Sequence, residues 1–432
     1  MKLVALHHRL SSFGGHRYNE GLGLIDESRR RGWELDLLVS VRTPDPVLRS
    51  LGGVARPVLD DPTFDFTRPF DRRVDDFARQ LAEHAQPSLT ADCRVLLTVA
   101  TQCEAAALAR WARSLPRARM PWFFVLFLSD RWNRAGARPD EPAEIETAAR
   151  DIARLPPAVR DRIVLCAATP GLADELAARL RHPVAPVPMH LNYAGFEAIA
   201  QSRGLRPAAA SPAIGLVGGM RPEKGSERIA GIVAACRTRT RARFVIQAFD
   251  EGADPATFAR LRALGADPDV LVIDGQLDRS AYERQLAGLD AVLCPYERLN
   301  YKHRSSGIFA EAVATGLPAI VPSGTWLAAQ IEAGRAAGVV FTDDAADCVA
   351  DAVARCVENL DGLTRDAAAR AGCWRETQSL GSCLDAMEQL RRSRAPAREP
   401  SAAAAGLASA LSLPARAANA LLAWSSIRPP RR

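Results

Sequence analysis

The sequence has no paired cysteines and few aromatic residues, and each absence argues against a class of protein. Its nine cysteines are an odd number, and no two of them form a Cys-x-x-Cys pair. Scattered single cysteines are typical of free thiols in a reducing compartment rather than of a disulfide scaffold or a zinc site. Aromatic residues make up only 6% and are not interleaved with basic residues, so we expect no nucleic-acid partner.

Long apolar runs are also missing. The longest lies around the segment PWFFVLFL, whereas a membrane-spanning helix needs about 20 apolar residues. The apolar part of the opening MKLVALHHRL is too short for a signal peptide. We therefore expect a cytoplasmic protein.

The charge balance is basic, with a net charge of +6 and a pI near 9.0. Two interpretations stay open. The excess is mostly arginine beside abundant alanine, which a GC-rich genome alone produces, or it attracts anionic partners such as nucleotide phosphates or membrane headgroups.

Short apolar runs alternate with helical patterns through both halves of the chain. The runs of the first half lie at 2–8, 33–40, 94–100, 121–129 and 162–168. Those of the second half lie at 213–219, 243–249, 270–276, 291–296, 318–323 and 338–343. Continuous apolar runs separated by helices are typical of parallel strands covered on both faces. The sequence thus predicts an α/β protein with two doubly wound, Rossmann-like domains and a ligand cleft between the carboxyl ends of their sheets.

The expected domain boundaries follow from changes in composition. Residues 1–201 form the first domain, the Ala/Pro/Ser-rich residues 202–212 a linker, and residues 213–375 the second domain. We expect residues 376–392 to form a helix that packs back on the first domain. The Ala/Pro-rich tail 393–432 is flexible, or it is an amphipathic helix at a membrane surface that Pro414 would break in two.

The segment LVGGMRPEKGSERIAG places Arg221, Lys224 and Gly225 between a strand and a helix. Free N–H groups at a helix start and nearby basic side chains favour a bound phosphate. The alternative is an ordinary strand-to-helix turn with solvated charges. The P-loop pattern is absent.

The segment YKHRSSGIFAEAVATGLPAIVPSG contains a second helix start of this kind. Ser305 and Ser306 suit a helix N-cap, and Gly307 lets a ligand approach the backbone. Glu311 lies in the second turn, too far into the helix to act as a cap. Its carboxylate either accepts hydrogen bonds from a ribose diol beside the phosphate site or is a solvated surface group.

Together with DAVLCPY, these two motifs resemble the nucleotide-binding domain of the GT-B retaining glycosyltransferases, especially family four, over about residues 213–335. That family has two glutamates eight positions apart, of which the second holds the nucleotide ribose and the first contacts the donor sugar. Glu311 matches the second, and His303 stands at the position of the first.

The resemblance also assigns the groups around the diphosphate. The backbone amides of Ser306 and Gly307 face it, with Ser305 and Arg304 beside them. Lys224 and Arg221 stabilise it, although they are three residues apart where the family usually has five.

In the first half the resemblance extends to architecture alone. Gly14 and Gly15 lie between the first strand and the first helix, where the family places a glycine loop against the donor phosphate, although plain turn chemistry gives the same pattern. Asp130 ends a buried strand at which the family has a sugar-contacting histidine. Three histidines lie near the same rim: His7, His8 and His16.

The resemblance therefore implies a retaining, metal-independent hexosyltransferase-like enzyme that uses a nucleotide-diphosphate sugar as donor and needs no further cofactor. Arg221, Lys224 and Asp130 are the predicted catalytic residues. The expected acceptor is a saccharide or a lipid-linked molecule in polysaccharide or glycoconjugate biosynthesis, with peripheral contact at the inner face of a membrane. The alternatives are a sugar-nucleotide epimerase of the same fold and a non-catalytic nucleotide-sugar-binding protein. The Asp-Pro-Asp run at 267–269 precedes a strand as a turn does, so we expect no metal there.

Overall fold

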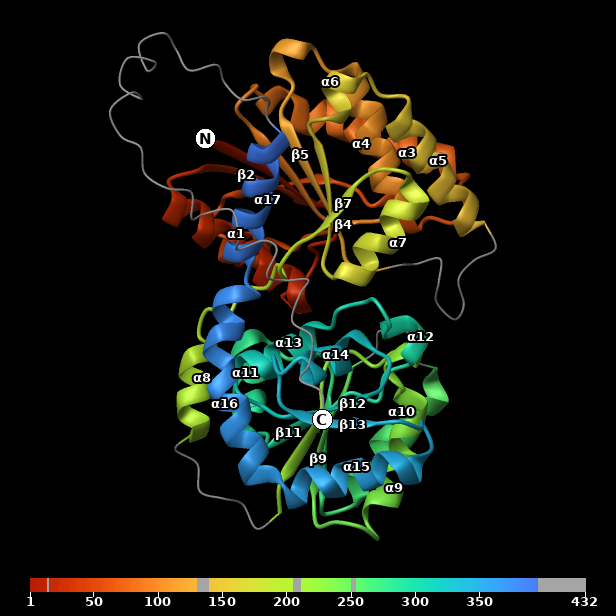
Figure 1. Cartoon of the computed structure of the whole chain (residues 1–432), viewed down its shortest axis with the longest axis vertical. Coiled ribbons are helices and arrows are strands. Elements are labelled where there is room, and N and C mark those ends of the chain that lie inside the picture. The colour runs from red at the N-terminus through yellow and green to blue at the C-terminus, as the bar shows by residue number, and fades with distance from the viewer. Residues whose placement is uncertain (14, 130–139, 205–210, 250–253, 395–432) are drawn as a thin grey trace, which may run out of the picture. The chain divides into compact units, whose positions relative to one another are not determined.

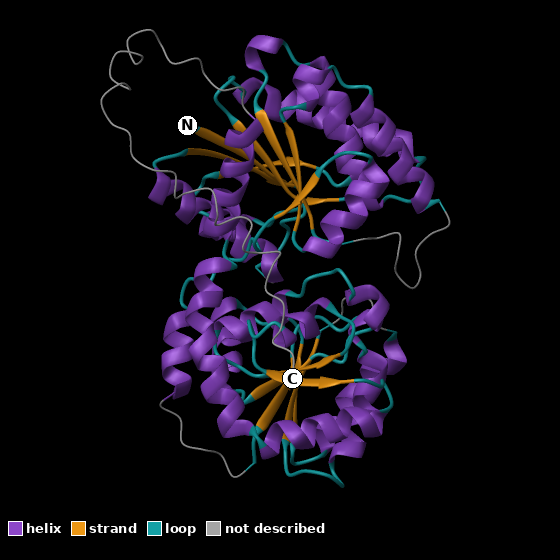
Figure 2. Cartoon of the chain, in the orientation of Figure 1, coloured by secondary structure: helices purple, strands orange, loops and turns teal. Residues whose placement is uncertain are grey.

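The computed structural model describes residues 1–13, 15–129, 140–204, 211–249 and 254–394 (Figure 1). The chain divides into one compact unit, Met1–Arg391, and a second unit, Arg392–Arg432. The first unit contains two sheets in which all paired strands are parallel, and helices surround each sheet (Figure 2). The predicted α/β class with two doubly wound sheets is confirmed.

The first sheet has seven strands in the order β3-β2-β1-β4-β5-β6-β7. Its strands are β1 (Lys2–His7), β2 (Glu34–Ser40), β3 (Ala55–Leu59), β4 (Arg94–Ala100), β5 (Trp122–Phe127), β6 (Ile163–Ala167) and β7 (Val184–Pro186). The chain order reverses between β1 and β4, and ligands of such sheets bind beyond the carboxyl ends of the strands at this point.

The second sheet has six strands in the order β10-β9-β8-β11-β12-β13. They are β8 (Ala213–Leu216), β9 (Arg243–Ala248), β10 (Val270–Asp274), β11 (Ala291–Leu293), β12 (Ala319–Pro322) and β13 (Gly338–Phe341). Here the chain order reverses between β8 and β11, which makes the carboxyl end of β8 the second expected ligand position.

The helices connect successive strands and then close the chain. Those up to the second sheet are α1 (Gly15–Arg31), α2 (Asp45–Ser50), α3 (Phe70–Gln80), α4 (Gln102–Ser114), α5 (Glu141–Ala153), α6 (Pro157–Arg160), α7 (Pro170–Leu180) and α8 (Phe196–Gly204). The later ones are α9 (Ile229–Cys236), α10 (Pro255–Ala263), α11 (Arg279–Gly288), α12 (Arg298–Tyr301), α13 (Gly307–Ala314), α14 (Trp326–Glu332), α15 (Ala346–Glu358), α16 (Leu360–Thr377) and α17 (Leu380–Arg394). Within the described residues, no helix combines the length and the apolar character needed to cross a membrane.

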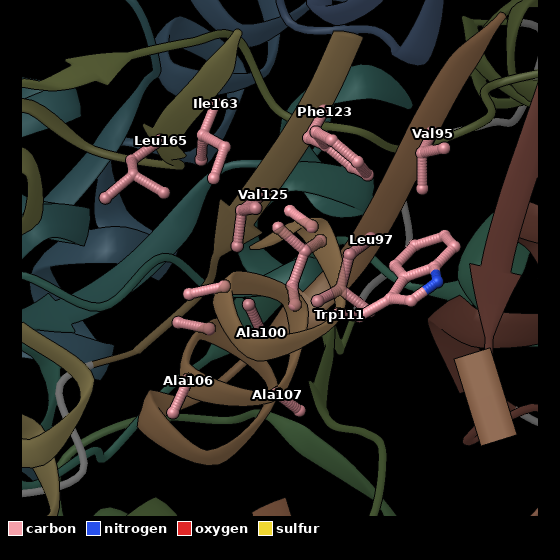
Figure 3. Packing of buried hydrophobic residues seen from close by; sticks show 14 of the residues in the cluster. Val95, Leu97, Ala100, Ala106, Ala107, Trp111, Phe123, Val125, Ile163 and Leu165 are labelled. Atoms are coloured by element: carbon pink, nitrogen blue, oxygen red, sulfur yellow. The ribbon is translucent and has the colours of Figure 1, made fainter. Parts of the chain in front are cut away.

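Helix α4 packs on the first sheet through a continuous apolar core (Figure 3). The Trp111 ring on α4 meets the Phe123 ring of β5 edge to face at 5.7 Å between centroids. Val95 and Leu97 of β4 and Val125 of β5 complete this layer, and all are buried. Burial of a side chain of this size contributes about 1.5–3 kcal/mol, so the position of α4 on the sheet is well determined.

Helix α17, the last one in the described residues, contacts α1 and the start of β4. The Arg31 guanidinium on α1 donates to Asp385 at 2.6 Å, and Arg94 at the start of β4 donates to Glu388 at the same distance. Helix α8 runs to Gly204, so the first residues of the expected linker are helical. The tail beyond Arg394 lies outside the described residues, and its suggested membrane contact stays a prediction.

A buried ion cluster links the segment after β1 to the start of α4. One Glu104 carboxylate oxygen lies 2.9 Å from Nε2 of His8 and accepts hydrogen bonds from Arg9 at 2.5 Å and from the Thr63 hydroxyl at 3.0 Å. The other oxygen accepts from the Thr101 backbone N–H at 2.9 Å, which completes the capping box of α4. Burial raises the pKa of the Glu104 carboxyl, but Arg9 and His8 outweigh burial and hold the pKa well below its usual range.

His8, Asp61 and Glu104 are close enough together to resemble a metal site. Arg9 already donates to both carboxylates, at 3.0 Å for Asp61. A guanidinium in this position repels a cation. We therefore interpret the cluster as structural: it fixes Arg9 at the edge of the cavity described below.

Replacement of Glu104 by glutamine removes the charge that compensates Arg9. We expect Glu104→Gln to lower the free energy of unfolding at pH 7 by about 3–5 kcal/mol, the usual cost of breaking a buried ion pair. The pKa of Glu104 is lower in the folded than in the unfolded state. Its contribution to the free energy of unfolding is therefore complete when the pH is above the unfolded pKa of about 4.3, and it is lost as the pH falls toward the folded pKa. The difference between wild type and variant should therefore narrow below about pH 4.

Urea unfolding at several pH values measures both effects. Exposed Glu146 on α5 is the control. Glu146→Gln makes the same chemical change and should alter stability by less than about 0.5 kcal/mol. Equal unfolding midpoints for Glu104→Gln and wild type at pH 7 would refute the assignment.

Candidate active site

A cavity of about 780 Å³ is lined by the segments that follow β1, β4 and β8, and by the starts of α11 and α13. This size lies within the range of about 300–1,000 Å³ that is usual for ligand sites. The cavity therefore occupies the positions at which both sheets are expected to bind ligands.

The β8–α9 connection brings Lys224 to this cavity. The Lys224 ammonium donates to the carbonyl oxygen of Gly219 at 2.9 Å. Gly225 follows with a φ of +74°, and a Cβ atom there would lie 2.1 Å from the carbonyl oxygen of Pro295. Only glycine can adopt this φ without strain and also leave room for the neighbouring carbonyl.

Two arginines from different loops meet at one carboxylate. Arg221, after β8, has its Nε 3.2 Å from Oε1 of Glu223, and Nη1 of Arg304, before α13, lies 3.5 Å from the same oxygen. All three residues line the cavity. Burial raises the pKa of the Glu223 carboxyl, but the charge of Arg221, a hydrogen bond from the Glu223 backbone and the charges of Arg304 and Lys224 outweigh burial and lower the pKa. The charges of the two loops therefore form one shared, partly exposed ion cluster at the cavity.

Helix α13 begins at the cavity wall. The Ser306 hydroxyl caps it by accepting from the Phe309 N–H at 3.2 Å. Ser305, Ser306 and Gly307 all line the cavity. The amino end of α13 thus brings its partial positive charge close to Arg221 and Arg304.

Glu311 on α13 is only 4% exposed and lines the same cavity. Its Oε2 accepts a hydrogen bond from the Tyr282 hydroxyl of α11 at 2.6 Å. Burial, together with the Glu311 charge, raises the pKa of Tyr282 well above its usual value, so the phenol remains a donor. The alternative of a solvated surface glutamate is therefore wrong.

His303 is placed differently from its neighbours. It is not among the described residues that line the cavity. Its ring lies against the start of α7, where a Cβ atom on Gly171 would be 2.2 Å from Nδ1. Its carbonyl oxygen accepts from the Thr169 hydroxyl at 2.5 Å. The absence of a side chain at Gly171 makes room for the ring. The assignment of His303 to the donor site stays a prediction.

Part of the predicted first-half site falls outside the described residues. Gly14 and Asp130 lie there, so their assignments stay predictions. Gly15 is the first residue of α1, and Ser129 lines the cavity.

A buried carboxylate that the sequence analysis missed belongs to this wall. Glu20 on α1 lines the cavity, and its Oε2 lies 3.3 Å from Nε2 of His7 and 3.7 Å from Nε2 of His190. Burial raises the pKa of Glu20, but His190 and His7 outweigh burial and lower it. Only the tertiary structure brings His190 to Glu20, because 170 residues separate them in the sequence.

Many solved structures share the overall fold of this chain. A glycosyltransferase from Rickettsia africae matches with a TM-score of 0.64 and 12% identity over 92% of this chain and 99% of its own. HepE from Anabaena, in complex with UDP and glucose, matches with a TM-score of 0.62 and 14% identity over 91% of this chain and 100% of its own. The UDP-forming trehalose-phosphate synthase from Burkholderia xenovorans matches with a TM-score of 0.61 and 12% identity over 92% of this chain and 99% of its own.

The chain has the GT-B fold. Coverage of nearly all of both chains supports this assignment, although the identities are low. No protein-family profile and no curated protein sequence matches the chain. The GT-B likeness inferred from the motifs after β8 and before α13 is confirmed at the level of the fold.

Gly225 offers a direct test of how the β8–α9 connection is held. We expect Gly225→Ala to lower the free energy of unfolding by about 1–3 kcal/mol. The new Cβ atom would clash with the Pro295 carbonyl oxygen, and the alanine backbone would have to keep a positive φ. The shifted loop should also weaken binding of inorganic pyrophosphate. Urea unfolding and titration calorimetry measure the two effects.

Gly324 is the matched control, since its φ is +72° and no atom lies within 4 Å of an added Cβ. Gly324→Ala should lose only about 1 kcal/mol through backbone strain and should keep its affinity for pyrophosphate. Equal losses of stability in the two variants would contradict the steric argument.

Proposed function

We propose that the chain is a retaining glycosyltransferase that moves a sugar from a nucleotide-diphosphate donor to a hydroxyl group of an acceptor. One observation carries the proposal. Two basic loops, the amino end of α13 and the buried Glu311 carboxylate all line a single cavity. Positive groups beside a carboxylate suit a diphosphate joined to a ribose diol.

In the proposed reaction the bond between the sugar's anomeric carbon and the donor phosphate oxygen breaks, and a bond to the acceptor oxygen forms. The acceptor proton passes to the donor phosphate, which leaves as the nucleoside diphosphate. Lys224, Arg221 and the start of α13 would stabilise the negative charge that develops on the leaving group. Loss of one preorganised donor of this kind costs about 3 kcal/mol, or roughly a hundredfold in rate.

The comparisons support a nucleotide-sugar donor. HepE was solved with UDP and glucose, and the Burkholderia synthase is described as UDP-forming. UDP is therefore the first nucleotide to test on this chain. A saccharide or lipid-linked acceptor remains the proposal for the other substrate.

The position of His303 favours a second candidate, a protein that binds a nucleotide sugar without transferring it. In the GT-B retaining glycosyltransferases that the sequence resembles, a glutamate at this position contacts the donor sugar. In this chain the position is His303, whose ring lies against Gly171. Calorimetry with UDP-sugars and a product assay with mixed saccharide acceptors separate the two functions. Binding of a donor without product would favour the second candidate, and product formation without an acceptor would favour an epimerase.

Lys224→Ala tests the diphosphate half of the site. We expect transfer to fall by about a hundredfold or more, with affinity lowered for pyrophosphate and UDP alike, because both ligands carry the charge that Lys224 compensates. Lys302→Ala is the control, since Lys302 is exposed and does not line the cavity. Full turnover by Lys224→Ala would show that this site assignment is wrong.

Glu311→Gln tests the ribose half. We expect UDP to bind about ten- to a hundredfold more weakly, because the variant loses charge-assisted hydrogen bonds to the ribose. The affinity for pyrophosphate should be unchanged, because pyrophosphate has no ribose. Glutamine keeps an oxygen that can accept from Tyr282, so the fold should persist. A parallel loss for both ligands would indicate damage to the cavity rather than loss of ribose binding.

A further inference from the structure

Glu223 places a negative charge inside the proposed diphosphate site. Its Oε1 is shared by Arg221 at 3.2 Å and Arg304 at 3.5 Å, and Lys224 is the next residue. A fixed negative charge beside these groups opposes the binding of an anion. Its presence there therefore needs a physical explanation.

The other acidic side chains that line the described part of the cavity have different partners. Glu283 is paired with Arg279 at 2.7 Å, Glu311 accepts from Tyr282, and Glu20 lies between two histidines. Among the described lining residues, Glu223 is the carboxylate that contacts arginines of both basic loops.

The main chain of Glu223 is fixed while its side chain borders the cavity. Its carbonyl oxygen accepts from the Glu297 N–H at 3.0 Å, and it lies in the single 3₁₀ turn Pro222–Lys224. The side chains of Arg221, Glu223 and Arg304 are 28%, 20% and 21% exposed. Ion pairs with this exposure can exchange partners without opening the apolar core.

We propose that Glu223 is a resident anion that occupies the diphosphate position of the two arginines when no ligand is bound. It holds Arg221 and Arg304 together in the ligand-free protein, and the donor diphosphate displaces its carboxylate. After transfer, renewed pairing of Glu223 with the arginines favours release of the nucleoside diphosphate. This role rests on the proposed function, since it requires a diphosphate ligand.

The test measures anion affinity directly. We expect Glu223→Gln to bind inorganic pyrophosphate and UDP about three- to tenfold more tightly than wild type, as removal of one partly exposed like charge predicts. The dissociation rate of UDP, measured by stopped flow, should fall by a similar factor, and the gain in affinity should shrink at high salt. In the transfer assay, KM for the donor should fall together with kcat.

The matched control is Glu227→Gln. Glu227 lies four residues further on, is exposed and does not line the cavity, and its replacement changes the net charge equally. The affinity of the Glu227→Gln variant for pyrophosphate should equal that of wild type. Glu223→Ala serves as a second variant and should bind more tightly as well, and the melting temperatures without ligand check that each variant is folded.

The outcomes separate this inference from the proposed function. If wild type binds pyrophosphate and UDP but Glu223→Gln binds them equally or more weakly, the inference is wrong and the proposed function stands. If Glu227→Gln gains as much affinity as Glu223→Gln, net charge alone explains the effect and the inference is also wrong. If wild type binds neither ligand, both are wrong.

Discussion

The close approach of the β8–α9 connection to the segment after β11 is the constraint on which the candidate site depends. The carbonyl oxygen of Pro295 accepts from Arg228 at 2.5 Å and lies where any side chain on Gly225 would project. The Glu297 N–H donates to the backbone carbonyl oxygen of Glu223 at 3.0 Å. Because these contacts join the two segments, the basic residues after β8 and those before α13 border the same cavity.

The environment of Glu311 then determines which chemistry suits the cavity. A carboxylate that is 4% exposed must be stabilised by hydrogen bonds or by charge. The Tyr282 phenol supplies one such hydrogen bond to Oε2 of Glu311. A carboxylate held in this way offers acceptors to a diol close to groups that attract phosphate.

How much the sequence predicted depended on whether the signal was local. The six strands of the second sheet and β1, β2, β4, β5 and β6 of the first were predicted, because buried parallel strands are continuous apolar runs. The edge strands β3 and β7 were missed: each is short and contains a proline, which is tolerated at an edge. The cavity-lining positions of Lys224 and Glu311 were expected from motif spacing, whereas the Glu20 cluster and the contact of His303 with Gly171 arise from residues far apart in the chain.

The two ion clusters at this cavity differ in the solvent exposure of their side chains, and exposure decides whether an ion pair can exchange partners. Glu104, His8 and Arg9 are nearly inaccessible, and Glu104 has backbone as well as side-chain donors. Exchange of partners in that cluster would leave a charge uncompensated in the core, which is strongly unfavourable. The pairs that Glu223 forms with Arg221 and Arg304 are at least one-fifth exposed on every side chain. Water or a ligand oxygen can replace the carboxylate there at small cost, so this second cluster can take part in a binding cycle while the first keeps the cavity wall in place.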